Sequence, residues 1–239
     1  MDQDLGAAHP VMRVRHETRR RQLTVRAIED ITPRMRRITC SADTMEGFVS
    51  LAPDDHIKLF FPGDAGPQMR DFTPRRFDVD AGMLEIDFAL HEAGPANAFA
   101  AAARPGDTIE IGGPRGSAVI AGDFDWYWLI GDETALPAIG RRLEEATEGT
   151  LFRTFVLVEG LKNRQMIETR ATWRANWIFR SEGESLLDAV RRPPLPAGDG
   201  LVWLAGEHGL VRGLRHHFVE ERNHPEEWVR ASSYWRLPE

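Results

Sequence analysis

Residues 124–138 read FDWYWLIGDETALPA, and this stretch decides the fold of the chain. Its first part, Trp126 to Ile130, is a continuous run of apolar side chains, which is typical of a strand buried on both faces of a parallel sheet. A turn over 131–134 follows, and a helix is predicted from Ala135 to Ala146. In a doubly wound sheet this turn faces the ligand. It lacks the G-x-G-x-x-G spacing, however, and Thr134 is also a good N-cap for the helix.

Strands and helices alternate from this stretch to the end of the chain. Buried apolar runs predict further strands over residues 150–158, 173–179, 201–205 and 228–231. Helices are expected between them, over residues 186–191 and 207–222. Such alternation is typical of parallel strands joined by helical crossovers. We therefore predict an α/β domain over residues 123–239.

The residues before Phe124 show a different pattern. Leu84 to His91 alternates apolar and polar side chains, which predicts a strand with one buried face. Similar short strands, separated by Gly and Pro turns, are expected over residues 22–28, 35–40, 56–61 and 108–111. Many short strands at this spacing indicate an antiparallel barrel. We predict the barrel over residues 13–122, after an irregular tail at 1–12.

Composition and charge exclude several classes of protein. The chain has 239 residues, a net charge of −7 and one cysteine, Cys40. A single thiol excludes a disulfide scaffold, a Cys-rich zinc module and a four-thiolate iron–sulfur cluster, and it favours a reducing, cytoplasmic location. The negative charge makes nucleic acid an unexpected partner. The longest run without a charged residue is 93–103, far short of the roughly 20 residues of a membrane span, so we expect neither a span nor a secretory signal.

The adjacent His216 and His217 point to different faces of their helix, so no metal site is expected.

Residues 70–75, Arg-Asp-Phe-Thr-Pro-Arg, are the first candidate binding motif. Arg70 and Arg75 present rigid, permanently charged guanidinium groups that suit phosphate oxygens. Phe72 offers a flat face to a planar ring, and Thr73 offers a small hydroxyl near the ring heteroatoms. A flavin dinucleotide requires this combination, although a packed surface strand explains the same residues.

The turn around Gly94 is the second candidate motif. A strand ends at His91, and Pro95 and Ala96 begin a short helix. The free N–H groups and partial positive charge at that helix N-terminus suit a pyrophosphate, although an ordinary strand–turn–helix connection explains the segment equally well. The C-terminal segment 232–236 contains two aromatic residues, which either anchor the chain end or supply a stacking surface at a ligand site.

Together these motifs resemble the siderophore-interacting protein family, the FAD-dependent ferric-siderophore reductases with a ferredoxin–NADP reductase fold. The matching segments run in family order from about residue 20 to the C-terminus: 32–35, 56–59, 70–75, His91 with 94–96, 105–107, 131–138, 206–208 and 234–236. The resemblance implies a six-stranded FAD-binding barrel, an NAD(P)H-binding parallel-sheet domain and an active site in the cleft between them. It also implies hydride transfer from a nicotinamide cofactor to the flavin, then one-electron steps to Fe(III) that release iron.

The resemblance assigns roles in the FAD site. Arg70 and Arg75 are expected to contact phosphate or ribityl oxygens. Phe72 and Thr73 are expected to border the isoalloxazine, Thr73 through a hydrogen bond near N5 or O4. The pyrophosphate and adenosine are expected to be held by His91, Gly94, Pro95 and Ala96. Phe72 stands where many family members have Tyr, which removes a hydroxyl but keeps the ring.

The nicotinamide side of the site is assigned in the same way. Thr134 and Glu207 are expected near the nicotinamide and flavin rings, and Trp235 is expected to contact the cofactor. The expected catalytic residues are Thr73, Thr134 and Glu207. Lys162 and Arg164 follow the strand whose end reads the adenosine ribose in doubly wound sheets. Positive charge there favours the 2′-phosphate of NADPH over NADH, although both cations are also explained as solvated loop residues.

A ferric siderophore, the expected substrate, is bulky and often anionic. We predict that Lys58 and Arg236 face one cleft that binds it, with Arg115 as a third cation, although ordinary surface positions explain the same charges. Two other functions stay open: a general flavin reductase or reductase partner of an oxygenase, and a non-catalytic siderophore-binding chaperone. The FAD motifs argue against the chaperone but do not separate the flavin reductase from the main hypothesis. We expect a monomer or a weak dimer.

Overall fold

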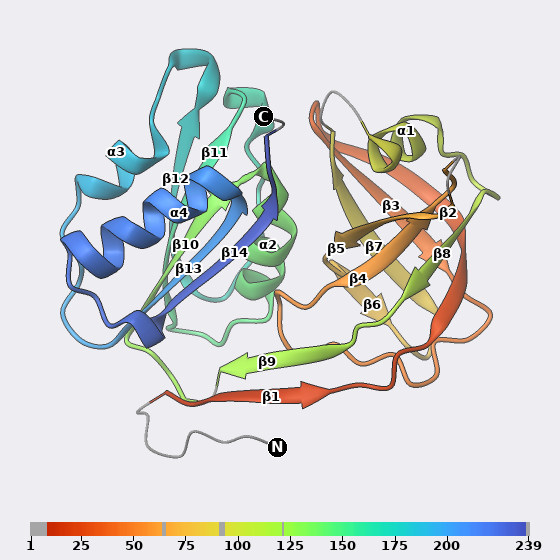
Figure 1. Ribbon diagram of the computed structural model, residues 1–239, viewed down its shortest axis with the longest axis horizontal. Helices are drawn as coiled ribbons and strands as arrows, with labels where there is room; N and C mark the ends of the chain where they lie inside the picture. Colours follow the sequence, from red (N-terminus) through yellow and green to blue (C-terminus); the bar gives the residue numbers. More distant parts are fainter. Residues whose placement is uncertain (1–8, 64–65, 91–93, 121, 238–239) are drawn as a thin grey trace. The chain divides into compact units, whose positions relative to one another are not determined.

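The computed structural model describes residues 9–63, 66–90, 94–120 and 122–237. The chain forms two compact units that divide between Ala121 and Gly122 (Figure 1). The first unit is built from antiparallel strands and the second from parallel strands with helices, which confirms the predicted fold class. Among the described residues, no helix combines the length and apolar character that crossing a membrane requires.

The first unit consists of short strands and one helix. Its elements are β1 (Val11–Arg15), β2 (Arg20–Thr32), β3 (Met35–Ser41), β4 (Ile57–Phe61), β5 (Gln68–Phe72), β6 (Arg76–Asp78), β7 (Met83–Ala89), α1 (Pro95–Ala102), β8 (Thr108–Gly112) and β9 (Gly116–Ile120). Seven strands form one antiparallel sheet in the order β5-β4-β8-β2-β3-β7-β6. A separate two-stranded ribbon pairs β1 with β9.

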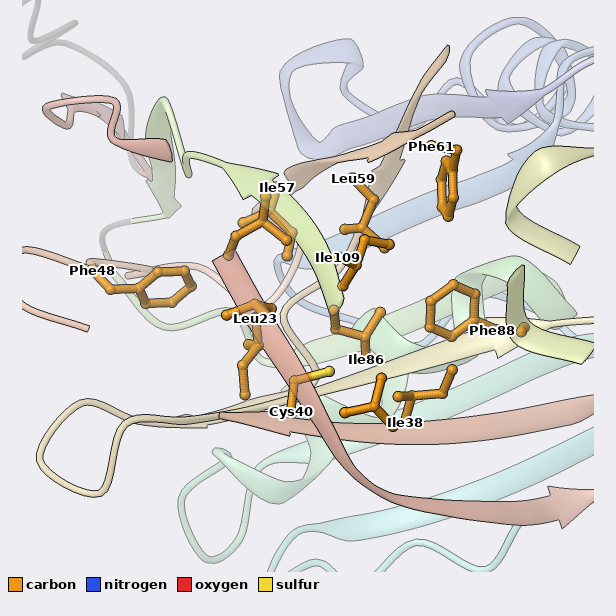
Figure 2. Close-up of a cluster of buried hydrophobic side chains, with 14 of the residues drawn as sticks. Leu23, Ile38, Cys40, Phe48, Ile57, Leu59, Phe61, Ile86, Phe88 and Ile109 are labelled. Atoms are coloured by element: carbon orange, nitrogen blue, oxygen red, sulfur yellow. The ribbon is translucent and has the colours of Figure 1, made fainter. Parts of the chain in front are cut away.

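The seven-stranded sheet curls around a hydrophobic cluster because apolar side chains recur at every second position of its strands. In β4, Ile57, Leu59 and Phe61 are buried, whereas Lys58 lies on the other face. Figure 2 shows these side chains gathered with Leu23, Ile38, Ile86 and Phe88 from the neighbouring strands. The cluster also encloses Cys40, and burial raises the pKa of its thiol to about 12, so the thiol is unreactive.

The sheet has seven strands, whereas the resemblance implied six and the sequence pattern located five. The two strands that the pattern did not locate are the short β5 and β6, which residues 73–75 separate. Four of the five residues of β5 are exposed, so its sequence lacks the alternation that reveals a strand. For the same reason β1 was missed: it begins at Val11, inside the segment expected to be an irregular tail.

The second unit alternates strands with helices. Its elements are β10 (Trp126–Asp132), α2 (Leu136–Glu144), β11 (Leu151–Val158), β12 (Thr172–Phe179), α3 (Leu186–Arg191), β13 (Gly200–Glu207), α4 (His208–His216) and β14 (Val229–Trp235). Short helical turns are η1 (Glu133–Ala135), η2 (Leu161–Asn163), η3 (Arg180–Glu182), the π-helical η4 (His217–Glu221) and η5 (Glu226–Trp228). The five strands pair in parallel in the order β12-β11-β10-β13-β14.

Helices cover both faces of this parallel sheet (Figure 1). On one face, Trp128 and Ile130 of β10 pack with Val190 of α3 and Leu214 of α4 in one hydrophobic cluster. Gly131 points to the opposite face, where a Cβ would lie 2.6 Å from the side chain of Ala135, just before α2. The apolar run that opens this unit is therefore enclosed from both sides, as its sequence predicts.

Candidate functional site

The strand order of the second unit places a candidate site at the carboxyl ends of β10 and β13. The chain runs outward from β10 through β11 and β12 on one side and through β13 and β14 on the other. Doubly wound sheets bind their ligands where the two halves separate. Asp132 ends β10 and Glu207 ends β13, so the topology brings two acidic residues to this edge.

Asp132 accepts hydrogen bonds from three segments at this edge. Its side chain is buried, and Oδ1 accepts from the backbone N–H of Thr134 at 2.9 Å and from the Thr134 hydroxyl at 2.5 Å. Oδ2 accepts from the backbone N–H of Glu207 at 2.8 Å and from the indole Nε1–H of Trp235 at 2.9 Å. One carboxylate therefore joins the turn after β10, the end of β13 and the end of β14. Asp132 belongs to one of the motifs that match the family, but the motif by itself assigns it no role.

Two glycines make room for this arrangement. Gly206 has a φ of 139°, and a Cβ there would lie 2.5 Å from Oδ2 of Asp132. A Cβ at Gly131 would lie 2.2 Å from the carbonyl oxygen of Ala205. A side chain at either position would push apart the strand ends that hold Asp132 and its partners.

Glu207, which the sequence analysis expected to be catalytic, caps helix α4. Its carboxylate accepts the backbone N–H of Leu210 at 2.9 Å. That hydrogen bond is the main reason why the pKa of Glu207 is lowered, with partial burial opposing it and the N–H groups of Leu237 and Gly209 adding to it. A carboxyl group with a lowered pKa is ionised at neutral pH, so Glu207 offers negative charge and lone pairs, not a proton.

A partly buried ion pair lies beside the same strand ends. Glu133 in η1 accepts two hydrogen bonds from the guanidinium of Arg180 in η3, one of them at 2.5 Å. Burial by itself lowers the pKa of Arg180, but the hydrogen bonds and charge of Glu133 outweigh burial and raise it. The pair neutralises the charge of Arg180 within the unit. No local sequence signal reveals it, because the partners are 47 positions apart.

The loop after β11 carries the two cations expected to read the nucleotide. Lys162 lies in η2 and Arg164 directly follows it, and both residues are exposed. Asn163 between them is buried. The loop also exposes Leu161 and Met166 to solvent. Both cations therefore lie in solvent near the carboxyl edge of the sheet.

In the first unit, the motif 70–75 spans the end of β5 and the turn that follows it. Phe72 is half-buried, and its ring packs against Phe88 with 4.6 Å between the ring centroids. Thr73 is buried. Arg70 is exposed, and its guanidinium donates to the backbone oxygen of Met69 at 2.8 Å. The packing fixes the Phe72 ring while Arg70 stays accessible to a ligand.

Arg75 differs from Arg70, because its side chain is buried against acidic groups of β7. Its Nε lies 3.6 Å from Oδ2 of Asp87, which also accepts hydrogen bonds from Arg37 at 2.7 and 2.9 Å. The backbone N–H of Arg75 donates to the carbonyl oxygen of Glu85 at 2.9 Å. The alternation of the strand puts Asp87 on the face opposite Ile86 and Phe88, and Asp87 is nevertheless buried, because the guanidinium groups of Arg37 and Arg75 lie against it.

Helix α1 begins at Pro95, as the turn motif predicts. Gly94 precedes it with a φ of 123°, and a Cβ there would meet no atom within 4 Å. Within the described ranges, no side chain caps the N-terminus of this helix. Ala96 lies in the first turn, so its backbone faces this open end. His91 lies outside the described residues, and its expected role stays a prediction.

The three cations expected to bind substrate lie on different elements. Lys58 is paired across β4 and β5 with Asp71, and Nζ lies 2.7 Å from Oδ1. Arg115 is exposed between β8 and β9, and Arg236 is exposed after β14. Lys58 and Arg115 belong to the first unit and Arg236 to the second. Their meeting in one cleft therefore stays a prediction.

Two family models match the chain one after the other. Residues 24–68 and 61–118 match the siderophore-interacting FAD-binding domain. Residues 124–238 match the model described as siderophore-interacting protein. The chain belongs to the siderophore-interacting protein family. Membership in this family confirms the resemblance drawn from the sequence motifs.

Relatives of this siderophore-interacting protein match it over nearly its whole length. The NADPH-dependent ferric-chelate reductase of Escherichia coli strain K12 is 32% identical over 246 residues, which cover 93% of this chain and 95% of that protein. The ferric vibriobactin reductase of Vibrio cholerae is 25% identical and covers 86% of this chain and 85% of its own. Among solved structures, a siderophore utilization protein from T. fusca superimposes with a TM-score of 0.88 at 31% identity and covers 97% of both chains.

Proposed function

We propose that this protein is an FAD-dependent reductase that takes electrons from NADPH and delivers them to ferric siderophores. One observation carries the proposal: the chain aligns over 93% of its length, at 32% identity, with an NADPH-dependent ferric-chelate reductase. An alignment of that extent includes both units, so the sites for the electron donor and for the flavin are both represented in it.

The first unit fits FAD. Arg70 supplies an exposed guanidinium for phosphate oxygens, and α1 supplies a helix N-terminus for the pyrophosphate. The open space at Gly94 leaves that N-terminus accessible to a phosphate group. Phe72 supplies an aromatic ring that is already fixed by Phe88, so binding requires little reordering of the side chain. Thr73, next to it, supplies a hydroxyl for the ring heteroatoms.

The buried pair of Arg75 and Asp87 changes the expected role of Arg75. Its guanidinium is compensated by Asp87 inside the unit, so we infer that Arg75 shapes the turn after Phe72 and leaves phosphate binding to Arg70. When bound, FAD supplies the redox chemistry, since a flavin accepts a hydride and gives up electrons singly.

The second unit fits a nicotinamide dinucleotide at the carboxyl edge of its sheet. Thr134, Glu207 and Trp235 meet there around Asp132. Lys162 and Arg164 are the exposed cations of the loop that follows β11, and we propose that they bind the 2′-phosphate that distinguishes NADPH from NADH. Arg180 is unsuited to this role because Glu133 already neutralises it.

The iron chelate is the substrate, and the chain contributes positive charge to bind it. We propose that Lys58 and Arg236, with Arg115 as a third cation, attract anionic ferric siderophores. Lys58 is paired with Asp71, but this pair is exposed to solvent, unlike the pair of Arg180 with the buried Glu133. Reduction then releases the metal, because Fe(II) carries less charge than Fe(III) and hard oxygen ligands hold it less tightly. The chain needs no metal ligands of its own for this reaction.

A comparison of electron acceptors tests this function. The FAD-loaded protein is given NADPH and either a ferric siderophore or free riboflavin at equal concentration. We expect faster NADPH oxidation with the ferric siderophore. Faster turnover with riboflavin would support the general flavin reductase instead. Tight siderophore binding by FAD-free protein, without turnover in either assay, would support the chaperone.

A further inference from the structure

Asp132 ends the central strand of the second unit, and its carboxylate receives four hydrogen bonds, two from the adjacent Thr134 and two from Glu207 and Trp235, which are distant in sequence. We propose that Asp132 is a positioning residue, which fixes the Trp235 indole and orients the Thr134 hydroxyl for a bound nicotinamide. This inference rests on the function proposed above, and it concerns a residue that the motif analysis left without a role.

The first step concerns the Thr134 hydroxyl. A threonine hydroxyl has one proton to donate and two lone pairs that accept. The Thr134 hydroxyl donates its proton to Oδ1 of Asp132 at 2.5 Å, and three N–H groups donate to the same carboxylate. Toward any ligand, Thr134 Oγ1 therefore presents lone pairs only. The chemistry complementary to these lone pairs is an N–H donor, which the carboxamide of nicotinamide provides and a carboxylate does not.

The second step concerns the Trp235 indole. Its Nε1–H is a donor without an acceptor function, and it points at Oδ2 of Asp132 at 2.9 Å. Trp235 is partly buried and ends β14. The hydrogen bond to a buried carboxylate directs its N–H toward Asp132 and restrains the rotation of the side chain at the chain end.

The third step concerns the two carboxylate oxygens together. Oδ1 binds the turn after β10, and Oδ2 binds the ends of β13 and β14. A rotation of the carboxylate would therefore break the bonds to the turn and the bonds to the two neighbouring strand ends. Gly206 leaves space for Oδ2, since a Cβ would lie 2.5 Å away. Thr134 and Trp235 are thereby held in one fixed relation to each other.

Asp132→Asn is the central variant. An amide has one oxygen, so one pair of donors must face an NH₂ group in place of an oxygen, and either Thr134 or Trp235 loses its acceptor. Asp125→Asn is the matched control: Asp125 lies just before β10, at the opposite, amino-terminal edge of the sheet, where its Oδ2 accepts the backbone N–H of Asp199 at 2.8 Å. A Cβ at Gly198 would lie 2.2 Å from that oxygen, so a glycine leaves space for the Asp125 carboxylate just as Gly206 does for the Asp132 carboxylate.

The first readout needs neither activity nor nicotinamide. In ¹H–¹⁵N spectra of the FAD-loaded protein, Trp235→Phe assigns one of the indole signals of the seven tryptophans. We expect Asp132→Asn to move this signal upfield and to speed its hydrogen exchange, and Asp125→Asn to leave it unchanged. An indole signal with the same shift and exchange rate in wild type and Asp132→Asn would overturn the positioning of Trp235.

The second readout compares the KM for NADPH with the KM for the ferric chelate. We expect Asp132→Asn to raise the KM for NADPH about tenfold, the effect of losing a hydrogen bond to a charged group, while the KM for the ferric chelate stays unchanged. Thr134→Val should raise the KM for NADPH in the same way, and Thr134→Ser should restore it. These two variants test the inference even if Asp132→Asn fails to fold. An unchanged KM in Thr134→Val would overturn it.

The two readouts also separate this inference from the proposed function. If the wild-type protein fails to oxidise NADPH with any acceptor, the proposed function fails, and the indole signal alone decides whether Asp132 holds Trp235. If the wild type is active but Asp132→Asn behaves like Asp125→Asn in both readouts, the inference fails and the function stands.

Discussion

Arg75 and Asp87 lie against each other inside the first unit, with 3.6 Å between Nε and Oδ2 and both side chains buried. Arg37 adds two shorter hydrogen bonds to the same carboxylate. The three residues link β3, β7 and the turn that follows Phe72. A motif that reads as two phosphate-binding arginines therefore contains one exposed and one buried arginine.

This separation predicts different effects for the two arginines. Asp87→Asn leaves two buried guanidinium groups undercompensated, so the free energy of unfolding should fall by about 3 kcal/mol and FAD affinity should fall with it. Arg70→Ala should weaken FAD binding without a comparable loss of stability, because Arg70 is exposed. Denaturant unfolding and titration of FAD fluorescence measure the two quantities. A normal stability for Asp87→Asn would refute the structural role of the cluster.

The pairing of Lys58 with Asp71 gives a charge test of the substrate site. Lys58→Ala should raise the KM for an anionic ferric chelate, whereas Asp71→Asn should lower it, because each change shifts the local charge in the opposite direction. Both effects should shrink at high salt. Arg26→Ala, another exposed cation of the first unit, serves as the control. If Lys58→Ala and Asp71→Asn change the KM in the same direction, charge at this pair does not govern substrate binding.

The loop after β11 predicts the preference between nicotinamide cofactors. Lys162→Ala and Arg164→Ala should each raise the KM for NADPH by roughly threefold to tenfold and leave the KM for NADH nearly unchanged, because only NADPH carries the 2′-phosphate. Arg192→Ala, in the exposed loop after α3, removes the same charge elsewhere and should change neither constant. Equal increases in the KM for NADPH and the KM for NADH would show that Lys162 and Arg164 do not bind the 2′-phosphate.

His224 predicts how stability depends on pH. Its ring is buried among Trp126, Phe218 and Trp228 and donates Nε2–H to the carbonyl oxygen of Gly200 at 2.8 Å. Burial lowers its pKa below the ordinary value of 6.5, so the folded protein favours the neutral ring. The stabilisation is complete above pH 6.5 and is lost as the pH falls through the window below it.

The matching experiment compares His224→Gln with the wild type. Unfolding free energies measured between pH 8 and pH 5 should fall less steeply for His224→Gln, which has no ring to protonate. His216→Gln, an exposed position of α4, should keep the wild-type slope. An identical slope in wild type and His224→Gln would show that His224 does not titrate differently in the folded and unfolded states.

The fold was largely predictable from hydrophobic periodicity. Apolar runs such as Trp126 to Ile130 identified the parallel strands, and Leu186–Arg191 was placed at its observed bounds. Among the strands that were missed, Gln68–Phe72 is exposed at nearly every position and owes its conformation to pairing with β4. Pairing partners distant in sequence leave no local pattern.

The candidate site was predictable only in part, and for a related reason. Residue types marked the motifs around Phe72 and Thr134, but they did not show which side chains were already engaged. Arg75 forms an ion pair with Asp87 of β7, and Glu133 forms one with Arg180. Asp132 accepts hydrogen bonds from donors that include residues more than 70 positions away. These contacts depend on tertiary pairing, so the sequence could name the site but not the partners that hold it.

An anaerobic single-turnover experiment tests the central claim most directly. The FAD-loaded protein is reduced with one equivalent of NADPH and mixed with a ferric siderophore in the presence of an Fe(II) trap. We predict that the flavin absorbance is lost with NADPH and returns with the ferric siderophore, as about two Fe(II) form for each hydride, because a hydride carries two electrons and each iron takes one. Flavin absorbance that NADPH does not bleach, or that the ferric siderophore does not restore, would contradict the claim.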